Sequence, residues 1–158
     1  MKDPRRTDRT QEICEIVRKA FADVKLGKGL GLQEAQGLDD YENEMTCAAY
    51  RAKDEKEDWE SIPVEELNRC NSSLSFFDAE GMRFHLPAFL IAELRGDFEF
   101  DLVFLLTHLG DYSKNQFVVL SDAQRSAVRA YLLHIQDAPE YEFDRPHIVR
   151  ALDEYWTT

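Results

Sequence analysis

The sequence predicts a mainly α-helical domain with one small β-hairpin, an α+β class with a compact, bundle-like architecture. Two observations predict the helices: apolar residues recur at helical spacing near both ends of the chain, and helix-cap signals precede them. A third predicts the hairpin, because apolar and polar residues alternate on both sides of a turn between residues 73 and 86. With 158 residues the chain can form one sizeable core, so we expect a single globular domain over residues 11–158.

The first ten residues, MKDPRRTDRT, are basic and are expected to form a flexible tail, with no apolar signal core behind them. An apolar stripe at positions i, i+3, i+4, i+7, i+8 and i+11 then predicts a helix, which Asp8 or Thr10 could cap. The stripe consists of Ile13, Ile16, Val17, Ala20, Phe21 and Val24. The helix should end in KLGKGLG, because glycines disfavour a regular helix.

A second helical segment is expected from about residue 32 into the fifties. Its apolar face would consist of Leu38, Tyr41 or Glu42, Met45 and Ala49. Its solvent face is strongly acidic and holds Glu34, Asp39, Asp40, Glu42 and Glu44. Pro63 then suits the first turn of a short helix that contains Val64 and Leu67.

The sequence DAEG, residues 78–81, is typical of a type I turn closed by a glycine with positive φ. In the hairpin that this turn would form, Ser75 lies opposite His85. One face of the hairpin is then apolar and holds Leu74, Phe76, Met82, Phe84 and Leu86. The other face holds Ser73, Ser75, Phe77, Arg83 and His85.

The chain leaves this hairpin at Pro87, which should lie in the first turn of a buried helix that ends at Gly96. Residues 98–106 are apolar on too many sides for periodicity to separate helix from strand, although the leucines here favour a helix. The sequence QFVVL, residues 116–120, fits a strand or an extended lead-in.

Two more helices follow. Ser121 and Gln124 form a capping box at the start of the first of them. Its apolar stripe consists of Ala127, Val128, Tyr131, Leu132 and Ile135. The last helix should be capped by Asp144 and carry Pro146 in its first turn.

The formal net charge is −12, and much of it comes from one part of the chain. Residues 34–66 carry three Lys or Arg against twelve Asp or Glu, whereas residues 1–33 carry eight against five. Such a field repels nucleic acid and anionic lipid and attracts a basic protein partner. The longest apolar run, LPAFLIAEL, is interrupted by Glu93, so no membrane association is expected. Three widely spaced cysteines favour a reducing, cytoplasmic location.

Few residues suggest chemistry. His85, His108, His134 and His147 form none of the spacings typical of metal sites, and GKGLG is not a phosphate-binding motif, so we expect no metal and no cofactor. The polar face of the predicted hairpin, with Ser75, Arg83 and His85, is a secondary site candidate, although a cross-strand serine–histidine pair is usually an ordinary hydrogen bond. The acidic segment with Asp54, Glu55, Asp58 and Trp59 is the first candidate for partner binding, since an aromatic anchor lies there within a charged rim.

Several segments resemble a family of small bacterial proteins of unknown function, the DUF6714 family. They are GLGLQEAQGLDDY, DEKEDW, SSLSFFDAEGMRFHLPAFLIAEL, FVVLSDAQRSAVRAYL and ALDEYW. The resemblance extends from about Ile13 to Trp156 and is most specific in DAEGMRFHLPAFL. It implies a stand-alone domain of this length and implies no reaction, ligand or catalytic residue.

Three functions are compatible with these patterns. The first is a non-catalytic acidic domain that binds protein, such as an immunity or inhibitor protein that neutralises a basic toxin or effector. The second is an enzyme of unrecognised type with its site on the polar face of the 73–86 hairpin. The third is a structural subunit of a larger assembly, whose oligomeric state the sequence leaves open.

Overall fold

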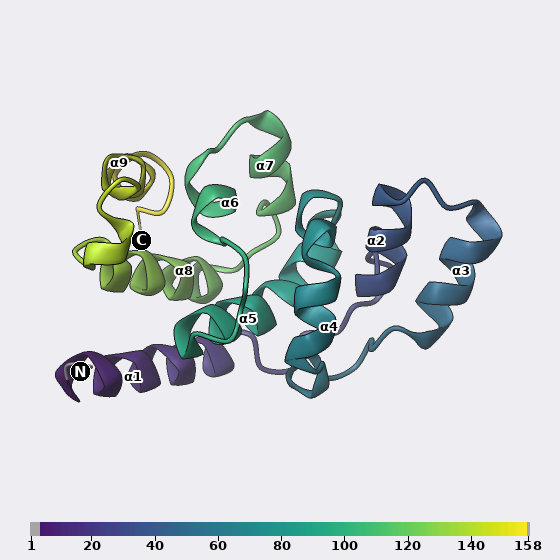
Figure 1. Ribbon diagram of the computed structural model, residues 1–158, viewed down its shortest axis with the longest axis horizontal. Coiled ribbons are helices and arrows are strands. Elements are labelled where there is room, and N and C mark those ends of the chain that lie inside the picture. The colour runs from purple at the N-terminus through teal and green to yellow at the C-terminus, as the bar shows by residue number, and fades with distance from the viewer. Residues whose placement is uncertain (1–3, 158) are drawn as a thin grey trace.

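The protein is described by a computed structural model that covers the backbone of residues 4–157 and the side chains of residues 8–157. Within that range the chain forms nine α-helices, three short 3₁₀ helices and no strand (Figure 1). The α-helices are α1 (Pro4–Ala20), α2 (Leu32–Asp39), α3 (Glu44–Lys53), α4 (Val64–Arg69), α5 (Ala79–Arg95), α6 (Val103–Thr107), α7 (Asp111–Gln116), α8 (Asp122–Ile135) and α9 (Arg145–Glu154). The 3₁₀ helices are η1 (Trp59–Ser61), η2 (Asn71–Ser75) and η3 (Pro139–Tyr141).

Helix α5 is the centre of the fold, and eleven of its seventeen residues are buried. Helix α1 packs against both α5 and α8, and α9 packs against α6 and α8. The indole of Trp156, which is fully buried, donates from Nε1 to the carbonyl of Leu106 at 2.8 Å and so joins the end of the chain to α6. The pair α2 and α3 extends at one end of the molecule, on the side opposite α9 (Figure 1).

The prediction of a β-hairpin over residues 73–86, and with it the α+β class, is wrong. Residues 71–75 form η2, and α5 begins at Ala79. The carboxylate of Asp78 accepts from the backbone N–H of Gly81 at 2.9 Å, so DAEG begins a helix and does not close a turn. The alternation was misleading because His85 is buried together with Phe84 and Leu86, as expected for a helix enclosed on all sides. Pro87 therefore lies inside α5 and not in its first turn.

Other boundaries differ from the expected ones in smaller ways. Helix α1 begins at Pro4, so residues 4–10 of the predicted tail are helical, and residues 1–3 lie outside the described residues. The single helix expected from residue 32 is two helices, α2 and α3, because the chain turns after Asp40 (Figure 1). Residues 98–102 are irregular before α6, and residues 116–120 form the end of α7 and a turn.

Some of the predicted caps are confirmed and others are wrong. Asp8 and Thr10 lie inside α1, which begins at Pro4, so neither is its cap, and α1 ends at Ala20, before KLGKGLG. Gly96 ends α5 with a φ of 78°, and Ser121 and Gln124 form the capping box of α8. Pro146 lies in the first turn of α9, while Asp144 occupies the N-cap position without a side-chain hydrogen bond. Within the described residues, no helix combines the length and the apolar character that a membrane span requires.

Candidate binding surface

Two of the four residues predicted to bind a partner are buried and hold the fold together. The carboxylate of Asp54 accepts from the backbone N–H groups of Gln33 at 2.8 Å and Glu34 at 3.1 Å, at the N-terminus of α2. Burial raises the pKa of Asp54, and these hydrogen bonds oppose that effect. The indole of Trp59 is 5% exposed and donates to the carbonyl of Phe21 at 3.0 Å, just after the end of α1, and η1 packs against α5, so Trp59 offers no anchor at the surface.

The other two residues, Glu55 and Asp58, reach the surface while stabilising their own loop. Glu55 accepts from the backbone N–H groups of Glu57 and Asp58 and from the hydroxyl of Ser61, and the backbone hydrogen bonds lower its pKa. Asp58 caps η1 by accepting from the N–H of Glu60 at 3.0 Å. The hollow of about 430 Å³ beside the loop is also lined by Lys53 and Lys56. Docking through this loop stays a prediction that depends on Glu55 and Asp58.

The secondary candidate, Ser75, Arg83 and His85, does not form one site. The imidazole of His85 is fully buried and its Nδ1 lies 2.7 Å from the carbonyl oxygen of Gly81. Because a carbonyl oxygen only accepts, Nδ1 carries the proton and Nε2 is left buried without a partner among the described residues. Arg83 and His85 are two positions apart on α5, about 200° around its axis. Ser75 belongs to η2, and within the described residues neither ring nitrogen of His85 is hydrogen-bonded to a serine.

A different surface combines exposed apolar side chains with concentrated charge. We call residues 38–45, LDDYENEM, the acidic tip; they comprise the end of α2, the connecting turn and the start of α3. The tip contains four Asp or Glu and no Lys or Arg. Three of its side chains are large and apolar, and Leu38 is 40% exposed, Tyr41 96% and Met45 83%. An almost fully exposed tyrosine beside an exposed methionine, within an acidic rim, is typical of a protein-binding surface.

The backbone of the tip presents Tyr41 outward. The N–H of Tyr41 donates to the carbonyl of Leu38 at 3.2 Å, and the N–H of Glu42 donates to that of Gly37 at 2.9 Å. These two bonds form a Schellman motif, in which the position after the C-cap adopts the left-handed conformation and is usually glycine. Here that position is Tyr41, with a φ of 60°. Asn43 then caps α3 by accepting from the N–H of Thr46 at 2.8 Å.

The tip is held firmly at its base. The hydroxyl of Ser73 in η2 donates to the carbonyl of Leu32 at 2.7 Å, which fixes the N-terminus of α2. Arg51 of α3 donates to the carbonyls of Gly27 and Gly29 and pairs with Glu34. This guanidinium therefore serves the base of the α2–α3 pair. It does not neutralise the carboxylates of the tip.

The left-handed conformation of Tyr41 predicts a measurable gain on mutation. We expect Tyr41→Gly to raise the free energy of unfolding by about 0.5–1 kcal/mol, because glycine adopts a positive φ without steric cost and the tyrosine ring packs against little. Urea denaturation measures the difference. Tyr41→Ala, which also removes the ring but keeps Cβ, is the control and should not be stabilising. Equal effects of the two variants would show that the ring, and not the backbone, determines the change.

A comparison with known protein families identifies the family of this chain. Residues 9–158 match the model of a family of unknown function, DUF6714. The chain belongs to the DUF6714 family. The match confirms the resemblance found in the sequence and covers slightly more of the chain at both ends. Neither a search of curated proteins nor a search of solved structures found a match.

Sequence reasoning assigned Tyr41 and Met45 of this DUF6714 protein to the inner face of one long helix. Both are instead exposed, because the chain turns between them. One local signal could have revealed the turn: Asn43 precedes Glu44, and asparagine followed by an acidic residue is typical of a helix N-terminus.

Proposed function

We propose that this protein is a non-catalytic acidic domain that binds a basic protein partner through the acidic tip. One observation carries the proposal: Tyr41, in the turn between α2 and α3, and Met45, in the first turn of α3, are exposed among carboxylates. Exposed side chains of this kind make few contacts in the free protein, so they can be buried against a partner without breaking contacts within the fold. The contacts within the tip give no structural reason for exposing these two side chains to water.

The charge of the tip supports the choice of partner. The tip carries a formal charge of −4 in eight residues, within a chain of net charge −12. Such a field accelerates the approach of a basic protein and disfavours acidic ones. The apolar side chains would then supply most of the affinity, while the carboxylates at the rim set the rate of association and its dependence on salt.

Within this proposal, we favour an immunity or inhibitor protein that neutralises a basic toxin or effector in the cytoplasm. Two observations support this. Ser75, Arg83 and His85 are not assembled into an acid–base site, and the hairpin on which the enzyme alternative depended is not formed. The three cysteines are free and buried, which suits a reducing compartment.

The experiment is a capture from host lysate followed by affinity measurement with matched variants. The tagged 158-residue chain is used as bait at about 50 mM and about 500 mM salt, and any basic partner recovered is then titrated against each variant. Asp40→Lys/Glu42→Lys reverses two charges of the tip. Asp137→Lys/Asp153→Lys makes the same change in net charge at two exposed positions outside the tip.

We expect the tip double variant to weaken binding at least about tenfold at low salt, while the control pair changes it only about two- to threefold. Tyr41→Gly should also weaken binding about tenfold or more although it stabilises the fold, because an aromatic anchor contributes on that order. If the two charge variants lost the same amount of affinity, net charge alone would explain the loss, and docking at the tip would be refuted. The same conclusion follows if Tyr41→Gly leaves the affinity unchanged.

A further inference from the structure

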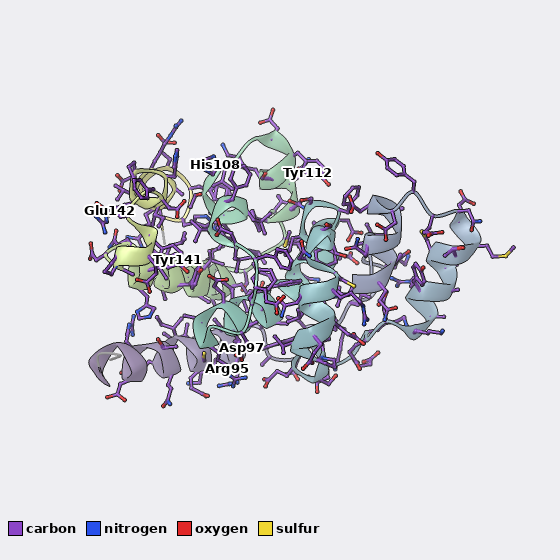
Figure 2. All side chains as sticks on the ribbon, viewed as in Figure 1. Arg95, Asp97, His108, Tyr112, Tyr141 and Glu142 are labelled. Carbon is purple, nitrogen blue, oxygen red and sulfur yellow. The ribbon has the colours of Figure 1, made fainter. Side chains whose placement is uncertain are left out.

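A second feature is a cleft of about 360 Å³ between η2, the segment before α6, and α7. Its volume lies within the range of small-molecule sites in proteins, near the lower end. We call it the aromatic cleft and define it by Leu74, Phe98, Phe100, Asp101, Phe104 and Tyr112. Figure 2 shows Tyr112 and His108, which also lines the cleft, on the α6–α7 side of the molecule, away from the acidic tip.

The aromatic side chains of the cleft are exposed but fixed in position. Phe100 is 49% exposed, Phe104 63% and Tyr112 62%. The ring of Phe104 stacks on His108, with centroids 4.1 Å apart and planes 17° from parallel. The hydroxyl of Tyr112 donates to the carbonyl of Ser75 at 2.7 Å. The ring centroid of Phe100 lies 5.9 Å from that of Phe98, and Phe98 is buried. The rings are therefore pre-organised, so a ligand would not have to order them.

The cleft contains one carboxylate, and its one histidine, His108, stacks on Phe104. Of the described residues that line it, Asp101 is the only Asp, Glu, Lys or Arg. Its Oδ1 accepts from the backbone N–H of Val103 at 2.8 Å, which fixes the carboxylate at the start of α6. Aromatic ring faces carry negative electrostatic potential and attract cations, and a nearby carboxylate adds to that attraction.

We propose that the aromatic cleft binds a small organic cation, and specifically a methylated ammonium. A ring face attracts a cation without accepting a conventional hydrogen bond, so it suits a quaternary nitrogen that has no N–H to satisfy. In water a primary ammonium donates three hydrogen bonds, which it would lose on entering the cleft, and aromatic walls replace them poorly. The proposal is independent of the partner proposed for the acidic tip.

The test is a titration of the ¹⁵N-labelled 158-residue chain, followed by NMR chemical shifts. Three probes share nearly the same skeleton: choline, ethanolamine as the primary ammonium, and 3,3-dimethyl-1-butanol as the neutral isostere of choline. We expect choline to bind with a Kd on the order of 1 mM and at least about fivefold more tightly than either of the others. The shifts should concentrate on residues 71–75 and 98–116.

Two variants with matched controls complete the test. Asp101→Asn keeps the acceptor for Val103 and removes the charge, and Phe104→Leu keeps apolar volume and removes the ring. Each should weaken choline binding about fivefold, whereas Asp153→Asn and Phe143→Leu, at exposed positions outside the cleft, should leave it unchanged. Equal affinity for choline and its neutral isostere, or for choline and ethanolamine, would overturn the proposal. Chemical shift changes at the acidic tip as large as those at the cleft, or no saturation by choline, would also overturn it.

Discussion

Replacing Gly31 with alanine is expected to lower the free energy of unfolding by about 2–3 kcal/mol. A Cβ added at this position would lie 2.1 Å from Oδ2 of Asp54 and 2.7 Å from its Cγ, so the carboxylate would have to move. Moving it breaks the hydrogen bonds to the backbone N–H groups of Gln33 and Glu34. Each buried donor left unsatisfied costs about 1–3 kcal/mol, and partial hydration reduces the sum.

A double-mutant cycle separates this cause from a general loss of packing. Asp54→Ala should cost about as much as Gly31→Ala, because both leave the same two N–H groups without an acceptor. Once Asp54 is replaced, the added methyl group at position 31 has room, so the double variant should be little less stable than either single variant. Urea denaturation at neutral pH measures all four proteins. Strictly additive losses would show that Gly31 and Asp54 act separately.

The pair has consequences for the proposed function as well as for stability. The N-cap position of α2 is Gly31, which has no side chain to offer, and a carboxylate more than twenty residues later in the chain takes over that role. The loop that holds Asp54 therefore supports the base of the acidic tip. The carboxylates in this part of the chain therefore have two roles. Asp54 is buried and stabilises the fold, whereas those of the tip face solvent.

Features encoded by neighbouring residues could be predicted from the sequence. The stripe through Ile13 and Val17 predicted the buried face of α1, and the capping box of Ser121 and Gln124 predicted the start of α8. Gly96 marked the end of α5. In each case the signal and the structure that it predicts lie within a few turns of one helix, so tertiary contacts add little to the prediction.

Features that depend on distant contacts could not be predicted. Trp59 lies in an acidic stretch that is typical of a surface, but η1 packs against α5 and its indole finds an acceptor at the end of α1. Asp78 suits a turn or a helix cap equally well in the sequence. The structure decides for the cap, because the same oxygen also accepts from the N–H of Leu30 at 3.0 Å, across 48 residues. The aromatic cleft is likewise assembled from segments that no local pattern brings together.

Stability is expected to fall with acidification through His85. Burial lowers the pKa of its imidazole to about 4, from an ordinary value of 6.5 in the unfolded chain. The imidazole lies in the core, where it stacks on Phe77 with ring centroids 4.4 Å apart. A proton on Nε2 would have no acceptor for its hydrogen bond, so the charged form is disfavoured. Because the folded-state pKa is depressed, the contribution is fully present above pH 6.5 and is lost as the pH falls towards 4.

The size of this effect follows from the two pKa values. Between about pH 7.5 and pH 5 the unfolded state gains a proton at His85 that the folded state does not, which costs about 2 kcal/mol of stability. Asp54 and Glu93 act in the opposite direction, because burial raises the pKa of both carboxyls and their protonation favours the folded state. The pH dependence of the wild-type protein alone therefore does not isolate the histidine.

His85→Phe isolates it, because phenylalanine keeps the ring contacts with Phe77 and cannot be protonated. The carbonyl of Gly81 retains the helical hydrogen bond from the backbone N–H of residue 85, so the substitution leaves no buried acceptor unpaired. Urea denaturation of both proteins at about pH 7.5 and pH 5 should show the wild type losing about 2 kcal/mol more than the variant. Parallel losses in the two proteins would mean that the folded state accommodates a protonated His85. That outcome would require Nε2 to reach water or an acceptor, and the burial of α5 at the centre of the molecule argues against it.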